Sequence, residues 1–108
     1  MEKEQIIEII RNLPRKVVGE LSEDHQIFEG NQDGAHFKIT KEIVPVSGNL
    51  AIYSLSVSGN VSSKDKIISE FITVLGKPIG ISSPEDFPGI DFVIWNAVEV
   101  DYQLQSTN

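Results

Sequence analysis

The stretch Ile90–Leu104 constrains the fold of this chain more than any other, because its apolar and polar side chains alternate. From Val98 onward every second residue is apolar, and the positions between them include Glu99 and Asp101. A period of two is typical of a β-strand that buries one face and exposes the other to water. The sequence therefore predicts a domain built on a sheet, with Glu99 and Asp101 facing the solvent.

The orientation of Trp95 depends on the path of the chain at Asn96. If Asn96 and Ala97 form a two-residue turn, Trp95 pairs with Val98 and joins the core. If the chain runs straight on, Trp95 lies on the opposite face and is open to a partner. One straight strand of fifteen residues would span about 50 Å, whereas a compact chain of this length has a radius of gyration of about 13 Å. A hairpin or sharp bend near Asn96 is the favoured interpretation, although alanine resists the positive φ of such a turn.

Two segments carry the period of an amphipathic helix. Residues 2–13 place isoleucines and a leucine at helical spacing and end at Pro14. Residues 63–75 do the same, with Ser62 and Asp65 at the spacing of a capping box and Gly76 placed to end the helix. The apolar face of this second helix comprises Ile67, Ile68, Phe71, Ile72 and Leu75.

Four further segments resemble strands, and turn-forming residues separate them. They are Lys16–Leu21, His25–Glu29, Ala35–Val44 and Leu50–Ser58. The fold class expected is therefore α+β: a mostly antiparallel meander sheet of five or six strands with helices 2–13 and 63–75, forming a single domain over residues 1–108. Within the Pro-, Gly- and Ser-rich segment before Ile90, Phe87 is interpreted as a loop residue anchored against the core or, if it is exposed, as an aromatic contact for a partner.

Composition limits the cellular setting. The chain has no cysteine, which excludes disulfides and thiolate zinc sites and favours a reducing compartment. The charged N-terminal segment is not typical of a signal peptide, and no apolar run has the roughly 20 residues that a membrane span needs. The expectation is a cytoplasmic domain of bacterial type with no membrane association.

The negative charge is concentrated in the last third of the chain. Residues 1–77 hold nine basic and eleven acidic side chains, a net charge of −2, whereas residues 78–108 hold five acidic side chains and no lysine or arginine, a net charge of −5. Nucleic-acid binding needs clustered positive charge, so no nucleic-acid partner is expected. The acidic segment is interpreted either as a solvated surface or as a docking surface for a basic protein.

No motif in the sequence demands catalysis or a cofactor. The run from Glu29 to Gly34 resembles the start of a calcium loop, but its twelfth position is Thr40 instead of the bidentate glutamate. His25 and His36 lie in neighbouring predicted strands without a recognised metal-binding spacing. We therefore expect no enzyme activity, no cofactor and no metal site.

The leading hypothesis is a non-catalytic domain that engages a basic protein, with the character of an immunity protein or antitoxin-like inhibitor. The alternatives are a small-molecule or peptide-binding module, with a pocket between sheet and helices that includes Tyr53 or Tyr102, and a homodimer joined through an edge strand. The predicted partner-binding residues are Glu85, Asp86, Phe87, Asp91, Trp95, Glu99 and Asp101.

Overall fold

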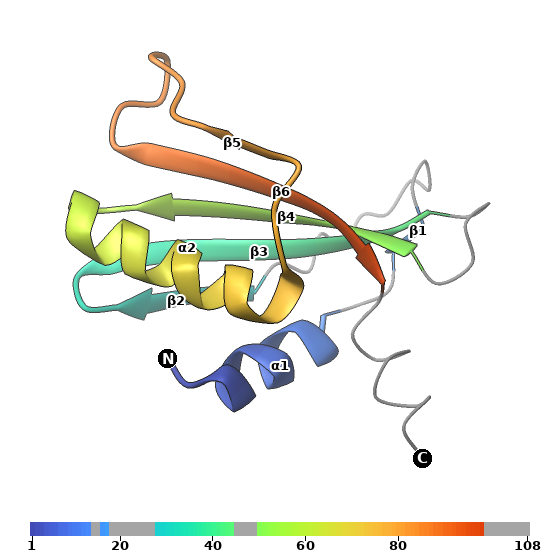
Figure 1. Ribbon diagram of the computed structural model, residues 1–108. Coiled ribbons are helices and arrows are strands. Elements are labelled where there is room, and N and C mark those ends of the chain that lie inside the picture. The colour runs from blue at the N-terminus through green and yellow to red at the C-terminus, as the bar shows by residue number, and fades with distance from the viewer. Residues whose placement is uncertain (14–15, 18–27, 45–49, 99–108) are drawn as a thin grey trace.

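The chain folds into an α+β arrangement in which two helices lie on one face of a mostly antiparallel sheet (Figure 1). The computed structural model describes residues 1–13, 16–17, 28–44 and 50–98. Within these residues the sheet has six strands in the order β1-β3-β4-β6-β5, and β2 pairs with β3 on the same side as β1. The α+β fold class is therefore confirmed. The strands are β1 (Lys16–Val17), β2 (Phe28–Gln32), β3 (Ala35–Ile43), β4 (Leu50–Ser58), β5 (Gly80–Ser82) and β6 (Ile90–Val98).

Strands β2, β3 and β4 follow one another as antiparallel neighbours, and β6 then adds to the far side of β4. Helix α2 connects β4 to β5, and β5 forms the outer edge beyond β6. Among the described strands, only β1 runs parallel to its neighbour, β3. In β3 and β4 buried and partly exposed residues alternate strictly, because one face of the sheet packs under the helices and the other does not.

Helices α1 (Lys3–Arg11) and α2 (Val61–Leu75) pack on the same face of the sheet, and the core lies beneath them (Figure 1). Three aromatic rings cross this core in contact: Phe37 lies 5.7 Å from Phe71, and Phe71 lies 6.5 Å from Trp95, between ring centroids. All three side chains are almost completely buried. This aromatic row joins β3, α2 and β6 into one core.

The N-terminal cap of α2 differs from the predicted one. Asn60, and not Ser62, is the N-cap residue, and its side-chain oxygen accepts a hydrogen bond from the backbone N–H of Ser63 at 2.8 Å. The helix therefore starts two residues earlier than the spacing of Ser62 and Asp65 suggested. At the other end, Gly76 follows the last turn with a φ of 85°, which agrees with its predicted role.

The predicted hairpin at Asn96-Ala97 is wrong. Strand β6 continues through both residues, with Asn96 opposite Ile52 and Ala97 opposite Ala51 in unbroken register with β4. Nine residues extend about 30 Å at the usual rise per residue, a length that needs no turn at this point. Residues 99–104, which carry the cleanest alternation, lie outside the described residues.

Two other elements differ from the sequence prediction. The turn between β2 and β3 is confined to Asp33 and Gly34, so β2 extends to Gln32, farther than the predicted His25–Glu29; residues 25–27 lie outside the described residues. Strand β5 was not predicted, since Gly80–Ser82 contains one apolar side chain and lies in a segment rich in turn-forming residues. Among the described residues, no helix is long and apolar enough to cross a membrane.

Candidate functional site

The predicted partner surface centres on the loop between β5 and β6, which projects beyond the sheet (Figure 1). Glu85 and Asp86 lie in this loop, and both are exposed. Within the described part of the chain neither carboxylate forms an ion pair or a hydrogen bond through its side chain. Among the described residues these two carboxylates are therefore exposed and unpaired, and their role in partner binding stays a prediction.

Phe87 does not anchor the loop in the core. Its side chain is 53% exposed, and its ring meets the ring of Phe92 edge-on with centroids 5.8 Å apart. Phe92 lies opposite Ser56, on the face of the sheet that points away from both helices. The predicted core anchor is wrong because the core lies on the other face. Phe87 and Phe92 instead form an aromatic pair at the surface.

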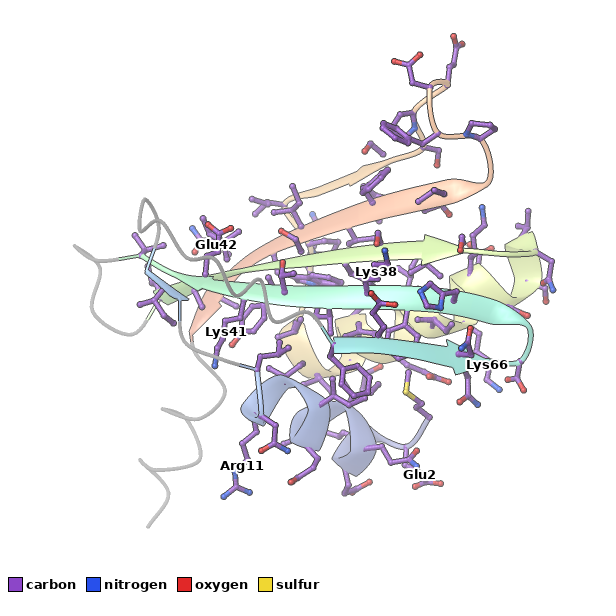
Figure 2. The ribbon with its side chains drawn as sticks, turned by 180° about the vertical axis from the view of Figure 1, so that it is seen from behind. Glu2, Arg11, Lys38, Lys41, Glu42 and Lys66 are labelled. Atoms are coloured by element: carbon purple, nitrogen blue, oxygen red, sulfur yellow. The ribbon has the colours of Figure 1, made fainter. Side chains whose placement is uncertain are left out.

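We call the face of the sheet opposite the helices the outer face, and define it by Ser54, Ser56, Phe92 and Ile94. Figure 2 looks onto this face, with α2 behind the sheet and Lys38 in front of β3. Two shallow hollows of about 280 and 290 Å³ lie on it, and both are lined in part by Lys38, Ser56 and Phe92. The serine side chains are half-buried and leave the neighbouring aromatic and aliphatic groups accessible.

Asp91 does not present unpaired charge. Its Oδ1 lies 3.5 Å from Lys64 Nζ and accepts a hydrogen bond of 2.7 Å from Ser83 Oγ. Lys64 also donates to the carbonyl oxygen of Gly89 at 3.3 Å. The side chains of Lys64 and Asp91 are only 8% and 16% exposed, so the pair ties α2 to the start of β6 under partial exclusion of water.

Lys64 is a residue that the sequence reasoning missed. It precedes Ile67, Ile68 and Phe71 by one helical turn and two, so it stands on the buried face of α2. A lysine on the apolar face of a helix indicates a buried counter-charge, and that signal was available from the spacing alone.

For a chain that does not turn at Asn96, the sequence predicted that Trp95 would be open to a partner. The structure places this residue elsewhere. The side chain is fully buried, and its Nε1–H donates to the carbonyl oxygen of Gly76 at 2.7 Å. In this strand Val93 and Trp95 face the helices, while Ile94 faces outward. Trp95 is therefore part of the core and not of a partner surface. Glu99, Asp101, Tyr102 and His25 lie outside the described residues.

The polar residues around the β2–β3 turn form pairs with one another. The two ring nitrogens of His36 lie 3.1 Å from Asn31 Oδ1 and 3.4 Å from Glu29 Oε2. Asp33 has a φ of 52°, and its Oδ2 accepts a hydrogen bond of 3.2 Å from Lys66 Nζ. That hydrogen bond, helped by the charge of Lys66, lowers the pKa of Asp33. In the described part of the chain, no group of three or more residues is arranged to hold a metal ion.

A separate groove of about 670 Å³ lies between α1 and β2, on the helix side of the sheet. The alternative function predicted from the sequence has its pocket between sheet and helices, and that alternative stays a prediction. Tyr53 does not line the groove, because this side chain is completely buried in the core.

The outermost strand offers an edge of the kind required by the predicted homodimer. Strand β5 pairs with β6 alone among the described strands, and Ile79 and Ile81 beside that edge are 69% and 57% exposed. The homodimer stays a prediction.

Comparisons of the chain with protein-family descriptions, with curated proteins and with solved structures found no match.

Proposed function

We propose that this chain is a non-catalytic protein-binding domain that engages a basic partner through a surface at one end of the sheet. The surface, named here the aromatic–acidic patch, consists of Glu85, Asp86, Phe87 and Phe92. The observation that carries the proposal is the exposure of Phe87, a residue that is 53% exposed although its ring contacts the ring of Phe92.

An exposed aromatic pair is a favourable anchor for a partner. Aromatic side chains dominate the binding energy of many interfaces because they bury a large area and lose little conformational entropy. The contact with Phe92 restricts the ring of Phe87 before any partner arrives. Ile94, which is 40% exposed on the outer face, extends the apolar surface along β6.

The charge beside the aromatic pair selects the partner. Glu85 and Asp86 are exposed, and Lys64, which lines the same hollow as Glu85, is already paired with Asp91. A partner with lysine or arginine residues around an apolar contact would therefore find uncompensated carboxylates at the rim. Such charge complementarity accelerates association and suppresses wrong partners, which is the character expected of an inhibitor of a basic protein.

The experiment selects a phage-displayed library of random peptides against the whole chain and then measures the affinity of the enriched peptides. We expect enrichment of peptides with lysine or arginine beside apolar residues. Phe87→Ala should weaken their binding at least tenfold, and Glu85→Gln with Asp86→Asn should reduce the dependence of affinity on ionic strength. Ile79→Ala, a matched loss of an exposed apolar side chain, should change little. Enriched peptides without basic residues, or equal binding to Phe87→Ala, would contradict the proposal.

A further inference from the structure

The groove between α1 and β2 is a second concave surface, well separated in the fold from the aromatic–acidic patch. It extends along the whole of α1, since residues 1, 5, 9 and 12 line one side of it, and the inner face of β2 lines the other. In Figure 2 this helix lies beside the β2 edge of the sheet, with Glu2 and Arg11 at its two ends. A volume of about 670 Å³ is within the range of sites for drug-sized ligands.

Gly30 gives this groove its floor. Phe28, Gly30 and Gln32 share the helix-facing side of β2, so the middle position of that row carries no side chain. A Cβ at Gly30 would lie 2.7 Å from Cζ of Phe37. The glycine therefore lets the Phe37 ring lie against the backbone of β2 and leaves the space above it open.

One aromatic ring, that of Phe28, is available to a ligand in the groove, and the buried ring of Phe37 supports it from below. Phe28 is 39% exposed, and its ring centroid lies 6.0 Å from that of Phe37. Ile9, half-buried on α1, faces them across the groove. The interior is thus apolar and partly aromatic, which favours a ligand with a hydrophobic body.

The polar side chains at the rim are acidic or neutral. Glu4 and Glu8 stand one helical turn apart on α1, both exposed, and none of the described residues that line the groove is a lysine, arginine or histidine. Glu8 approaches Arg11 only to 3.9 Å, with both side chains more than half exposed, so water screens that contact. The remaining rim residues are the carboxamides Gln5, Asn12, Asn31 and Gln32.

We propose that this groove binds a small organic cation, namely a protonated amine attached to an apolar or aromatic body. The body would lie on Phe28 and Ile9 in place of water. The ammonium group would reach Glu4 and Glu8 and could also lie near the face of an aromatic ring, which attracts cations. A neutral ligand of the same shape would gain the apolar contact alone, and an anionic one would meet the two carboxylates unfavourably.

The test uses three probes with similar apolar bodies and different charges: phenylbutylammonium, phenylbutanol and phenylpentanoate. Each is titrated into the ¹⁵N-labelled full chain while the backbone amide spectrum is recorded. We expect the ammonium compound to bind about two- to fivefold more tightly than the alcohol and the carboxylate to bind most weakly. The amides that shift should belong to α1 and β2.

Variants separate the two parts of the site. Glu4→Gln with Glu8→Gln should remove the preference for the ammonium probe while binding of the alcohol persists, and both substitutions are at exposed positions that leave the core intact. Glu85→Gln with Asp86→Asn is the control, because it makes the same change in net charge at the aromatic–acidic patch. It should leave the preference for the ammonium probe unchanged, which distinguishes the groove from that patch. Phe28→Ala should weaken all three probes about tenfold.

Several results would overturn the proposal. One is the absence of chemical-shift changes at α1 and β2 with any probe, and another is equal binding of the cationic and anionic probes. A third is an ammonium preference that survives in the variant with Glu4→Gln and Glu8→Gln. Phage-selected peptides can still bind the aromatic–acidic patch under any of these outcomes, so the two proposals fail independently.

Discussion

The indole N–H of Trp95 donates to the carbonyl oxygen of Gly76 at 2.7 Å, which joins the middle of β6 to the residue that ends α2. The ring also contacts Phe71 on the same helix. Trp95 therefore contacts α2 both at its C-terminal end and along its buried face.

Replacement of Trp95 by phenylalanine tests this contact. Trp95→Phe keeps an aromatic ring in the core but removes the hydrogen bond and part of the buried volume, and we expect a loss of about 1–3 kcal/mol in the free energy of unfolding. Trp95→Ala should cost about 3–5 kcal/mol, since it also leaves a large cavity. Urea denaturation followed by circular dichroism measures both variants, which have no tryptophan fluorescence. A phenylalanine variant as unstable as the alanine variant would argue against the assigned contribution of the ring.

Phe71 occupies the centre of the aromatic row between Phe37 and Trp95 and is completely buried. Phe71→Ala should therefore lower the free energy of unfolding by about 3–5 kcal/mol, because the surrounding β-strands cannot move in to fill the space. Thr73→Ala, at an exposed position of the same helix, should stay within about 0.5 kcal/mol of the parent chain. Thermal melts of the two variants compare them directly, and similar melting temperatures would show that α2 does not pack as described.

Local patterns predicted the elements of this fold better than their orientation. Helix α2 was evident from its apolar period and from Gly76, which are properties of adjacent residues. Strand β6 was harder, since Phe92 and Ile94 are as apolar as Val93 and Trp95 and both faces of the strand look fit for burial. The helices settle the question by covering only one face, and that placement depends on contacts between distant segments.

The candidate site was predictable only in part, for the same reason. Exposure of Glu85 and Asp86 followed from their position in a proline-rich loop. The pairing of Asp91 with Lys64 did not, because these residues are far apart in sequence and meet only when α2 packs beside the start of β6. The groove at Gly30 depends likewise on a ring from β3, although a glycine within a strand often marks a close approach.

Asp33 gives the chain a predictable dependence on acid. The hydrogen bond from Lys66 Nζ, together with the charge of Lys66, lowers the pKa of the Asp33 carboxyl below its ordinary value of 3.8. A carboxyl whose pKa is lower in the folded state stabilises the fold fully above the unfolded value and loses that contribution as the pH falls through the folded value. The stability of the parent chain should therefore decrease with acid more steeply below about pH 4 than that of Asp33→Asn.

The carboxyl titration provides the control for this prediction. In an NMR titration, Lys66→Met should return the pKa of Asp33 toward its ordinary value, and added salt should do so in part, since both side chains are more than half exposed. Asparagine is a suitable replacement for Asp33 because it tolerates the φ of 52° at this turn. An unchanged pKa in the Lys66 variant would show that the hydrogen bond is not the cause.

The pair of Lys64 and Asp91 is best tested by a double-mutant cycle. Either single change leaves a charge without its counter-ion in a site that is only 8–16% exposed, so Lys64→Met retains a free carboxylate and Asp91→Leu a free ammonium group. We expect each single change to cost about 2–3 kcal/mol in the free energy of unfolding, less than a fully buried pair would because some water reaches both groups. The double change should cost clearly less than the sum, because no unpaired charge remains.

The same cycle tests how the pair supports the proposed partner surface. Lys64 also donates to the carbonyl oxygen of Gly89, two residues after Phe87. The ammonium group therefore contacts both the loop and the carboxylate of Asp91. Lys64→Met should therefore weaken the binding of phage-selected peptides. The double variant, which also lacks Lys64, should bind them weakly even though it has recovered most of its stability. Additive costs of the two changes, measured by urea denaturation, would mean that the two side chains act independently. The loop would then have to owe its position to contacts other than this ion pair.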